Sequence, residues 1–171
     1  MRSSTSSPSS GYADLRTQIV ASGIIEAADI TDITPLSGGV SSDIVLVRCA
    51  GHAPFVVKRA LGQLRVRDPW FADVSRNRIE QAWLAYAARL APASVPRMLH
   101  RADTWFAMEY LGTELTPWKT ELLAGRVDLR HAQRAGEFLG AIHRASWADP
   151  EAARVFATGR GFHELRIEPY L

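Results

Sequence analysis

The sequence predicts an α+β fold, in which a five-stranded antiparallel sheet with one inserted helix is followed by a helical region. Three observations support this prediction. Up to Gly112, short β-branched and aromatic segments alternate with turns that contain glycine or proline. After Gly112, apolar residues recur at helical spacing. The chain has 171 residues, of which 47% are hydrophobic, and this is enough to form a buried core.

The predicted strands occupy five segments before Gly112. The first two lie within residues 30–47, on either side of a glycine turn, and Ile44-Val45-Leu46-Val47 has the composition of a buried strand. The third strand, residues 54–58, follows a second glycine-containing turn, which predicts an antiparallel hairpin. Residues 95–100 and 104–111 complete the sheet.

Two helices are predicted in this first part of the chain. One is short and covers residues 12–22. The other covers residues 74–90, follows an irregular segment over residues 61–74 and ends before Pro92. Its expected apolar stripe consists of Ile79, Trp83, Tyr86 and Leu90.

The region after Gly112 is predicted to be helical, with its longest helix over residues 130–147. The apolar residues at helical spacing are Leu129, Ala132, Ala135, Leu139 and Ile142. Gly136 and Gly140 lie on a neighbouring face among charged residues, which favours close packing on a soluble helix over pairing in a membrane.

Composition excludes several classes of protein. The 20 basic and 18 acidic residues form no block of like charge, which argues against a nucleic-acid-binding surface. Cys49 is the only cysteine, so a cytoplasmic location is expected. Residues 1–11 are rich in serine and should form a disordered tail, and no apolar stretch has the length of a membrane span. The five histidines lack metal-ligand spacing, so no metal site is predicted.

A glycine turn lies between the first two predicted strands and contains Gly38, Gly39, Ser41 and Ser42. Backbone N–H groups and small side chains allow a loop to approach the phosphates of a nucleotide closely. The turn therefore predicts a phosphate-binding loop, and an ordinary hairpin turn is the alternative. The turn does not match the Gly-x-Gly-x-x-Gly pattern of protein kinases.

Lys58 ends an apolar strand in a chain that has only one other lysine, Lys119. A compact ammonium group at this position can reach the α- and β-phosphates of a nucleotide from the sheet. Such a lysine needs a carboxylate to hold it, and Glu80 lies at the border of the apolar face of the next predicted helix. We therefore expect Glu80 to position Lys58, with a solvated glutamate as the alternative.

The last predicted strand ends at Met108, Glu109, Tyr110 and Leu111, directly before Gly112. In such a segment exposed backbone N–H and C=O groups can bind the edge of an adenine base, and the glycine lets the chain leave the sheet. We interpret residues 108–111 as an adenine-binding hinge. A plain edge strand is the alternative.

The order of these motifs resembles that of the aminoglycoside phosphotransferase and choline kinase-like family, which has the protein-kinase-like fold. The resemblance covers residues 30–171. The segments that carry it are the glycine turn, Val56-Val57-Lys58, Glu80, Met108-Glu109-Tyr110-Leu111 and Leu139-Gly140-Ala141-Ile142-His143. Residues 118–125 and 162–171 are also similar to segments of methylthioribose kinases.

The resemblance implies a nucleotide-binding N-terminal lobe over residues 12–112 and the start of a helical C-terminal lobe over residues 113–171. It implies ATP and Mg²⁺ as cofactors. The family's His-Gly-Asp loop and its magnesium ligands do not occur in this chain, so no catalytic residue is predicted. We therefore expect a truncated or fragmentary small-molecule kinase that is inactive alone and whose acceptor would bind the missing lobe. The alternative is a non-catalytic nucleotide-binding or protein-interaction module.

Incompleteness of the C-terminal lobe would also leave apolar side chains uncovered. These side chains lie in residues 130–147 and in residues 162–171. Exposed apolar patches favour association between molecules. The chain is therefore expected to self-associate.

Overall fold

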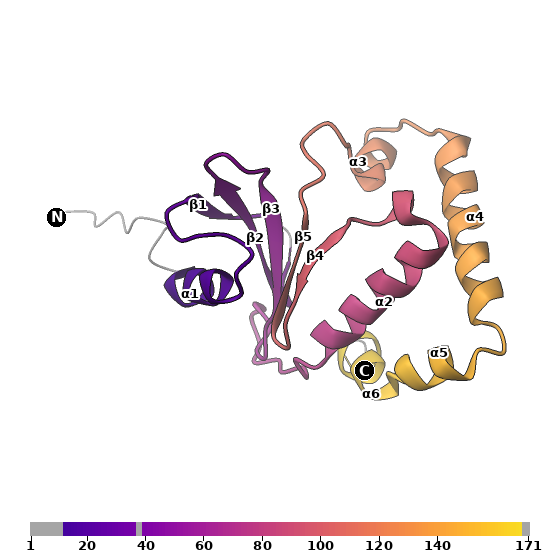
Figure 1. The fold of residues 1–171 in the computed structure, drawn as a ribbon. Coiled ribbons are helices and arrows are strands. Elements are labelled where there is room, and N and C mark those ends of the chain that lie inside the picture. The colour runs from indigo at the N-terminus through magenta and orange to yellow at the C-terminus, as the bar shows by residue number, and fades with distance from the viewer. Residues whose placement is uncertain (1–11, 37–38, 169–171) are drawn as a thin grey trace. The chain divides into compact units, whose positions relative to one another are not determined.

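The computed structural model describes residues 12–36 and 39–168. The chain divides into two compact units (Figure 1). The sheet unit consists of Met1–Asn77 and Met98–Tyr110, and the helical unit consists of Arg78–Arg97 and Leu111–Leu171. The chain passes for the last time from the sheet unit to the helical unit between Tyr110 and Leu111, within the segment that the sequence identifies as a hinge.

The sheet unit contains one five-stranded sheet with the strand order β1-β2-β3-β5-β4. Its strands are β1 (Ile30–Pro35), β2 (Ser42–Cys49), β3 (Phe55–Ala60), β4 (Met98–Arg101) and β5 (Trp105–Glu109). Every neighbouring pair is antiparallel. The predicted fold class is therefore confirmed, because each of the five expected segments forms a strand.

Helix α1 (Ala13–Ala21) packs against one face of this sheet (Figure 1). Leu15 and Ile19 of the helix are fully buried. They join a core with alternate residues of the strands, namely Val45 and Val47 of β2, Phe55 and Val57 of β3, and Trp105 and Ala107 of β5. Alternation places one residue in two on each face of a strand, so this core uses one side of the sheet.

The segment between β3 and α2 (Arg76–Leu90) is irregular, as predicted, but it contains a small hairpin. Gln63 and Phe71 form an isolated antiparallel bridge. The N–H of Leu64 donates to the carbonyl of Trp70 at 2.8 Å, and the N–H of Ala72 donates to that of Gly62 at 3.1 Å. We call residues 61–75 the β3–α2 segment.

The helical unit holds most of α2 and the helices that follow β5. These are α3 (Trp118–Leu123), α4 (Leu129–Ser146), α5 (Pro150–Val155) and α6 (Gly159–Phe162), together with the short helical turns η2 (Pro92–Ser94) and η3 (His163–Ile167). Among the described residues, no helix has both the length and the apolar character required to cross a membrane.

The buried stripe of α2 differs from the predicted one. Its buried residues are Asn77, Gln81, Leu84 and Ala87. The predicted stripe was wrong. Two of the buried positions, Asn77 and Gln81, carry amide side chains, which an apolar pattern does not include. Of the residues expected there, Trp83 remains 39% exposed, and its ring packs edge-on against that of Phe138 in α4 at 6.3 Å.

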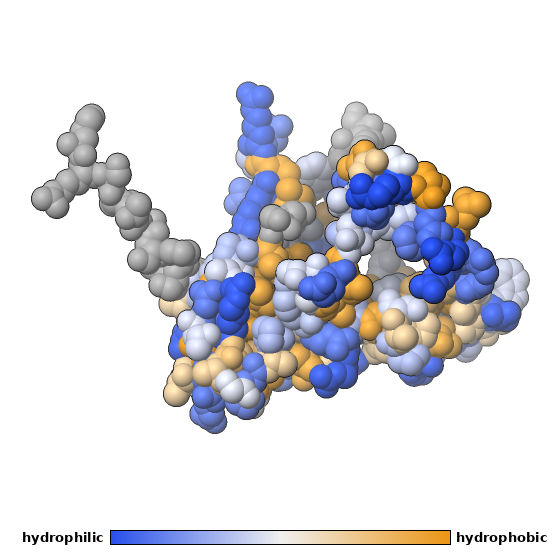
Figure 2. Space-filling model, turned by 90° about the horizontal axis from the view of Figure 1, so that it is seen from above, coloured by the Kyte–Doolittle hydropathy of each residue, from blue (hydrophilic) through white to orange (hydrophobic). Residues whose placement is uncertain are grey.

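Helix α4 begins at an N-cap, where the carboxylate of Asp128 accepts a hydrogen bond of 2.9 Å from the N–H of Arg130. No residue of α4 is buried. The predicted close packing at Gly136 and Gly140 was wrong, because no described atom beyond the local helix backbone lies within 4 Å of an added Cβ. Figure 2 shows apolar residues, coloured orange, at the molecular surface.

Candidate functional site

Lys58 lies on the face of the sheet opposite α1. In the strand register it pairs with Ile44 of β2 and with Phe106 of β5. The neighbouring positions of this face carry Leu46, Val56 and Met108, in line across the same three strands. Lys58 is half-buried, and it is the cationic residue between Val56 and Ala60 on this face of β3. Leu46 and Val56 are buried and Met108 is half-buried, so Lys58 is a polar group on a largely covered apolar face.

The glycine turn precedes β2, and the structure describes its residues from Gly39 onward. Gly38 lies outside the described residues. A Cβ added to Gly39 would come within 3.0 Å of the carbonyl oxygen of Ser42, so a side chain at this position would force the backbone to move. Ser42 is buried at the start of β2. The turn is therefore tight at Gly39, and a larger residue at this position would displace it.

Up to Met108, β5 has a neighbouring strand on each side. Met108 pairs with Met98 of β4 and with Val56 of β3. Glu109 still pairs with Phe55 of β3, but it lies beyond the last β4 pair. Since β5 lies between β3 and β4, it is not an edge strand. The alternative interpretation of residues 108–111 as a plain edge strand is therefore wrong. Tyr110 is half-buried, Leu111 is 51% exposed, and Gly112 has a positive φ of 78°.

Glu80 lies in the first half of α2 and is half-buried. It precedes the buried Leu84 by one turn and the buried Ala87 by two, so it borders the buried stripe of the helix. Its position within α2 agrees with the prediction. Lys58 and Glu80 belong to different units, and the ion pair between them stays a prediction.

A buried carboxylate, Asp43, holds a charged network that the sequence prediction missed. Asp43 is 3% exposed and accepts hydrogen bonds from the guanidinium groups of Arg59, at 2.8 Å, and of Arg65. Arg59 also donates to Asp14 of α1 at 2.6 Å. The network therefore ties α1, β2, β3 and the β3–α2 segment together.

The network changes the acid–base properties of its members. Burial alone would lower the pKa of Arg59, but its hydrogen bonds to Asp43 and Asp14 outweigh burial and raise that pKa. The hydrogen bond from Arg59 also lowers the pKa of Asp14. Asp43 and Arg59 face each other in the register of β2 and β3, and this opposite-charge pair was the available sequence signal.

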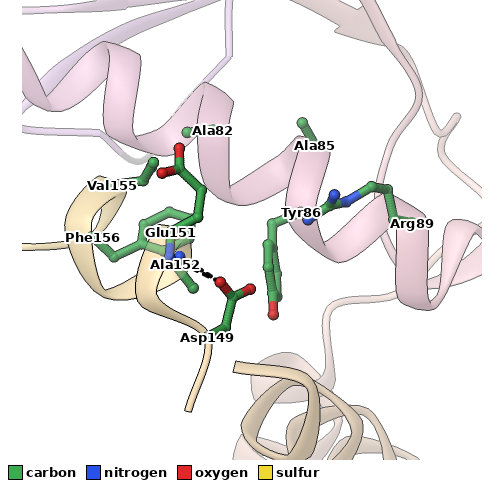
Figure 3. Close-up of a pocket in the computed structure, with 9 residues that line it drawn as sticks. All are labelled: Ala82, Ala85, Tyr86, Arg89, Asp149, Glu151, Ala152, Val155 and Phe156. Atoms are coloured by element: carbon green, nitrogen blue, oxygen red, sulfur yellow. Dashed lines mark hydrogen bonds between the residues drawn. The ribbon is translucent and has the colours of Figure 1, made fainter. Parts of the chain in front are cut away.

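A cavity of about 340 Å³ lies within the helical unit, between α2 and α5 (Figure 3). It is lined by Ala82, Ala85, Tyr86, Arg89, Asp149, Glu151, Ala152, Val155 and Phe156. The rings of Tyr86 and Phe156 meet edge-on at 5.8 Å, and the guanidinium of Arg89 lies 4.9 Å from the centre of the Tyr86 ring. None of the predicted site residues lines this cavity.

In residues 12–36 and 39–168, no group of three or more His, Cys, Asp or Glu side chains is arranged to hold a metal ion.

Comparison with known proteins gives one family and several structural neighbours. A profile of the phosphotransferase enzyme family (APH) matches residues 32–168. A protein assigned as a fructosamine-3-kinase from Thermobifida fusca YX-ER1 is similar in structure, with 21% identity and a TM-score of 0.47 over 77% of this chain and 38% of that chain. APH(2″)-IIa in a ternary complex with streptomycin and ATP gives 19% identity and a TM-score of 0.38 over 65% and 32% of the two chains.

The present chain thus matches 38% of the length of the first protein and 32% of the length of the second. A search among curated protein sequences gave no significant match.

Proposed function

Because the chain belongs to the phosphotransferase enzyme family, we propose that it is the ATP-binding part of a kinase that transfers the γ-phosphate of ATP to a hydroxyl group of a small molecule. The match over residues 32–168 confirms the family resemblance drawn from the order of the motifs. The observation that carries the proposal is the position of Lys58. Lys58 lies on an otherwise apolar face of β3, the face that also carries Met108, and next to β2, the strand that follows the glycine turn.

The proposed roles follow from the chemistry of each group. The ammonium of Lys58 neutralises charge on the α- and β-phosphates, and the carboxylate of Glu80 holds it in place. Backbone N–H groups of residues 39–42 cover the phosphates. The half-buried side chain of Met108 packs against the base, and the backbone of residues 108–111 binds its edge.

The residues present fit a nucleotide triphosphate. A tight turn at Gly39 permits close approach of an anion to backbone, and one lysine supplies the positive charge. ATP would supply the transferred phosphoryl group. Kinases of this fold also use Mg²⁺, and we assign none of the described residues to that ion. A cytoplasmic location, inferred from the single cysteine, stays a prediction.

The test uses the only two lysines as a matched pair. ATP at about 100 times its Kd should stabilise the chain by about 2.7 kcal/mol, which thermal unfolding would detect as a raised Tm. Lys58→Ala should weaken ATP binding about 10- to 100-fold, because a charge-assisted phosphate contact is lost. Lys119→Ala, at an exposed position of α3, should leave the affinity unchanged.

Two outcomes would decide between the alternatives. Unchanged ATP affinity in Lys58→Ala would remove Lys58 from the site. Absence of any ATP-dependent rise in Tm for the wild-type chain would favour the protein-interaction module.

Glu80→Gln should weaken ATP binding less than Lys58→Ala does, since it removes the partner of the lysine and not the phosphate contact itself.

A further inference from the structure

The β3–α2 segment contacts the glycine turn through the carbonyl groups of the turn. The N–H of Leu61 donates to the carbonyl of Ser41 at 3.0 Å. The N–H of Arg65 donates to the carbonyl of Val40 at 2.8 Å. Two consecutive carbonyls of the turn are therefore held by one neighbouring segment.

Arg76, the first residue of α2, adds a charged donor to the same contact. Its Nη2 donates to the carbonyl of Ser41 at 2.5 Å and to that of Leu61 at 2.6 Å. Its Nη1 donates to the carbonyls of Ala72 at 3.1 Å and Asp73 at 2.8 Å. One guanidinium thus joins the turn, the end of β3 and the chain before α2. A planar group with five N–H donors can do this, whereas the single nitrogen of a lysine cannot.

Arg65 is fixed in a second way, through its side chain. Its guanidinium donates to the buried carboxylate of Asp43, which also accepts from Arg59. The carboxylate of Asp43 is 3% exposed, so water cannot readily replace a lost cationic partner, and this favours both contacts. The donor that holds the carbonyl of Val40 is therefore anchored to the sheet itself.

This contact determines where the N–H groups of the turn point. No peptide bond in the described residues is cis. In a planar trans peptide the C=O and the next N–H point in opposite directions. Because the carbonyls of Val40 and Ser41 point toward the β3–α2 segment, the N–H groups of Ser41 and Ser42 point away from it.

We propose that Arg76 is a positioning residue, which fixes the carbonyl side of the glycine turn so that the N–H groups of Ser41 and Ser42 are presented to the phosphates of a nucleotide. The inference rests on the proposed function for its ligand. It adds to that function a residue outside the motifs, supplied by the start of α2. Arg76 touches no phosphate in this arrangement and acts through the backbone of the turn.

The first measurement needs no nucleotide. Amide hydrogen exchange at Leu61 and Arg65 reports directly on the two backbone hydrogen bonds to the turn. Arg76→Ala removes the charge-assisted hydrogen bonds to the carbonyls of Ser41 and Leu61, so local opening becomes easier and exchange at both amides should speed up about 10- to 100-fold. Arg76→Lys should give an intermediate rate. Arg67→Ala, at an exposed position of the same segment, should leave both rates unchanged.

The second measurement compares ATP with adenosine by calorimetry. Arg76→Ala should raise the Kd for ATP about tenfold and leave that for adenosine unchanged, because the turn contacts phosphate only. Loss of folded structure would instead weaken both ligands equally. Arg76→Lys, which keeps the charge, should lie between Arg76→Ala and the wild type.

Each result decides a separate part of the inference. Wild-type exchange rates in Arg76→Ala would overturn the positioning role, and so would an equal loss of ATP and adenosine affinity. If the wild-type chain binds adenosine and ATP with the same affinity, the proposed contact between the turn and the phosphates is wrong. If the wild type binds neither ligand, the proposed function fails and the nucleotide part of the inference fails with it, while the exchange rates still decide whether Arg76 holds the turn.

Discussion

The sheet unit and the helical unit bury apolar side chains to very different extents. Among the described residues, the buried apolar residues of the helical unit are Leu84, Ala87 and Ala152, and all the others belong to the sheet unit. Large apolar side chains of the helical unit are open to solvent instead, with Trp147 86% and Leu129 78% exposed. The sheet unit has a core of its own, whereas the helical unit leaves large apolar side chains at its surface.

The ion pairs of the two units differ in the same sense. In the sheet unit Arg59 reaches Asp14 across 45 residues of sequence, and Arg65 reaches Asp43 across 22. In the helical unit Arg126 pairs with Glu121, Arg154 with Glu151 and Arg160 with Glu164, all within five residues. Long-range pairs fix elements against each other, whereas local pairs support single turns of helix.

The largest effect should come from the buried carboxylate. Asp43→Ala leaves the guanidinium of Arg59 without its buried partner and should lower the free energy of unfolding by about 3–5 kcal/mol. Glu151→Ala, at an exposed local pair of the helical unit, should leave the midpoint of urea denaturation unchanged. Equal losses in the two variants would remove the distinction between long-range and local pairs.

Core truncation should separate the units almost as clearly. Leu15→Ala, at a fully buried position of α1, should lower the free energy of unfolding by about 2–5 kcal/mol, because it leaves a cavity. Leu139→Ala in α4 removes a side chain that is 53% exposed and should cost less than about 0.5 kcal/mol. A large loss for Leu139→Ala would show that α4 is covered in solution.

Self-association should depend on the helical unit. The exposed side chains of Leu129 and Trp147 predict dimers or larger species in light scattering, with a mass that rises with concentration. Replacing both by serine should shift the mass toward that of the monomer. Val66→Ser changes an exposed apolar residue of the sheet unit and should not. A monomer at all concentrations in the wild type would contradict the prediction.

The smallest effect concerns the cap of α4. The hydrogen bond from the Arg130 side chain, followed by that from the Arg130 N–H, lowers the pKa of Asp128 from 3.8 to about 2. A lowered pKa means that the carboxylate stabilises the folded cap fully above about pH 4, and that this contribution is lost as the pH falls toward 2.

The carboxyl carbon of Asp128, followed by NMR, should therefore titrate near pH 2. Asp128→Asn keeps a capping oxygen without a titrating group, so the amide of Arg130 should no longer shift in this pH range. Titration of Asp128 near its ordinary value would show that the cap does not form in solution.

Sequence patterns predicted the strands of the sheet unit because each strand is encoded locally, by a run of β-branched and aromatic residues between turns. They failed on the buried stripe of α2, because burial there depends on distant partners. The amide of Asn77 donates to the carbonyl of Asp103 at 3.2 Å, 26 residues away. An apolar pattern gives no sign of such a contact.

The candidate site divides in the same way. Lys58 and the glycine turn stand out in the sequence through their residue types and order. Arg76 does not, because its partners are backbone carbonyls, which every residue possesses. The contact of Arg76 with Ser41 spans 35 residues and follows from the path of the β3–α2 segment alone. Side-chain motifs can be found in a sequence, whereas the supports of a backbone loop need the fold.

The scarcity of lysine also turns the chain into its own chemical probe. An amine-reactive reagent has two side-chain targets in this molecule, one half-buried on β3 and one exposed on α3. Acylation of Lys119 would then serve as an internal reference for acylation of Lys58 within each digest. A ligand that covers the face of the sheet would lower the labelling ratio of Lys58 to Lys119, and no engineered tag or substitution would be needed to follow it.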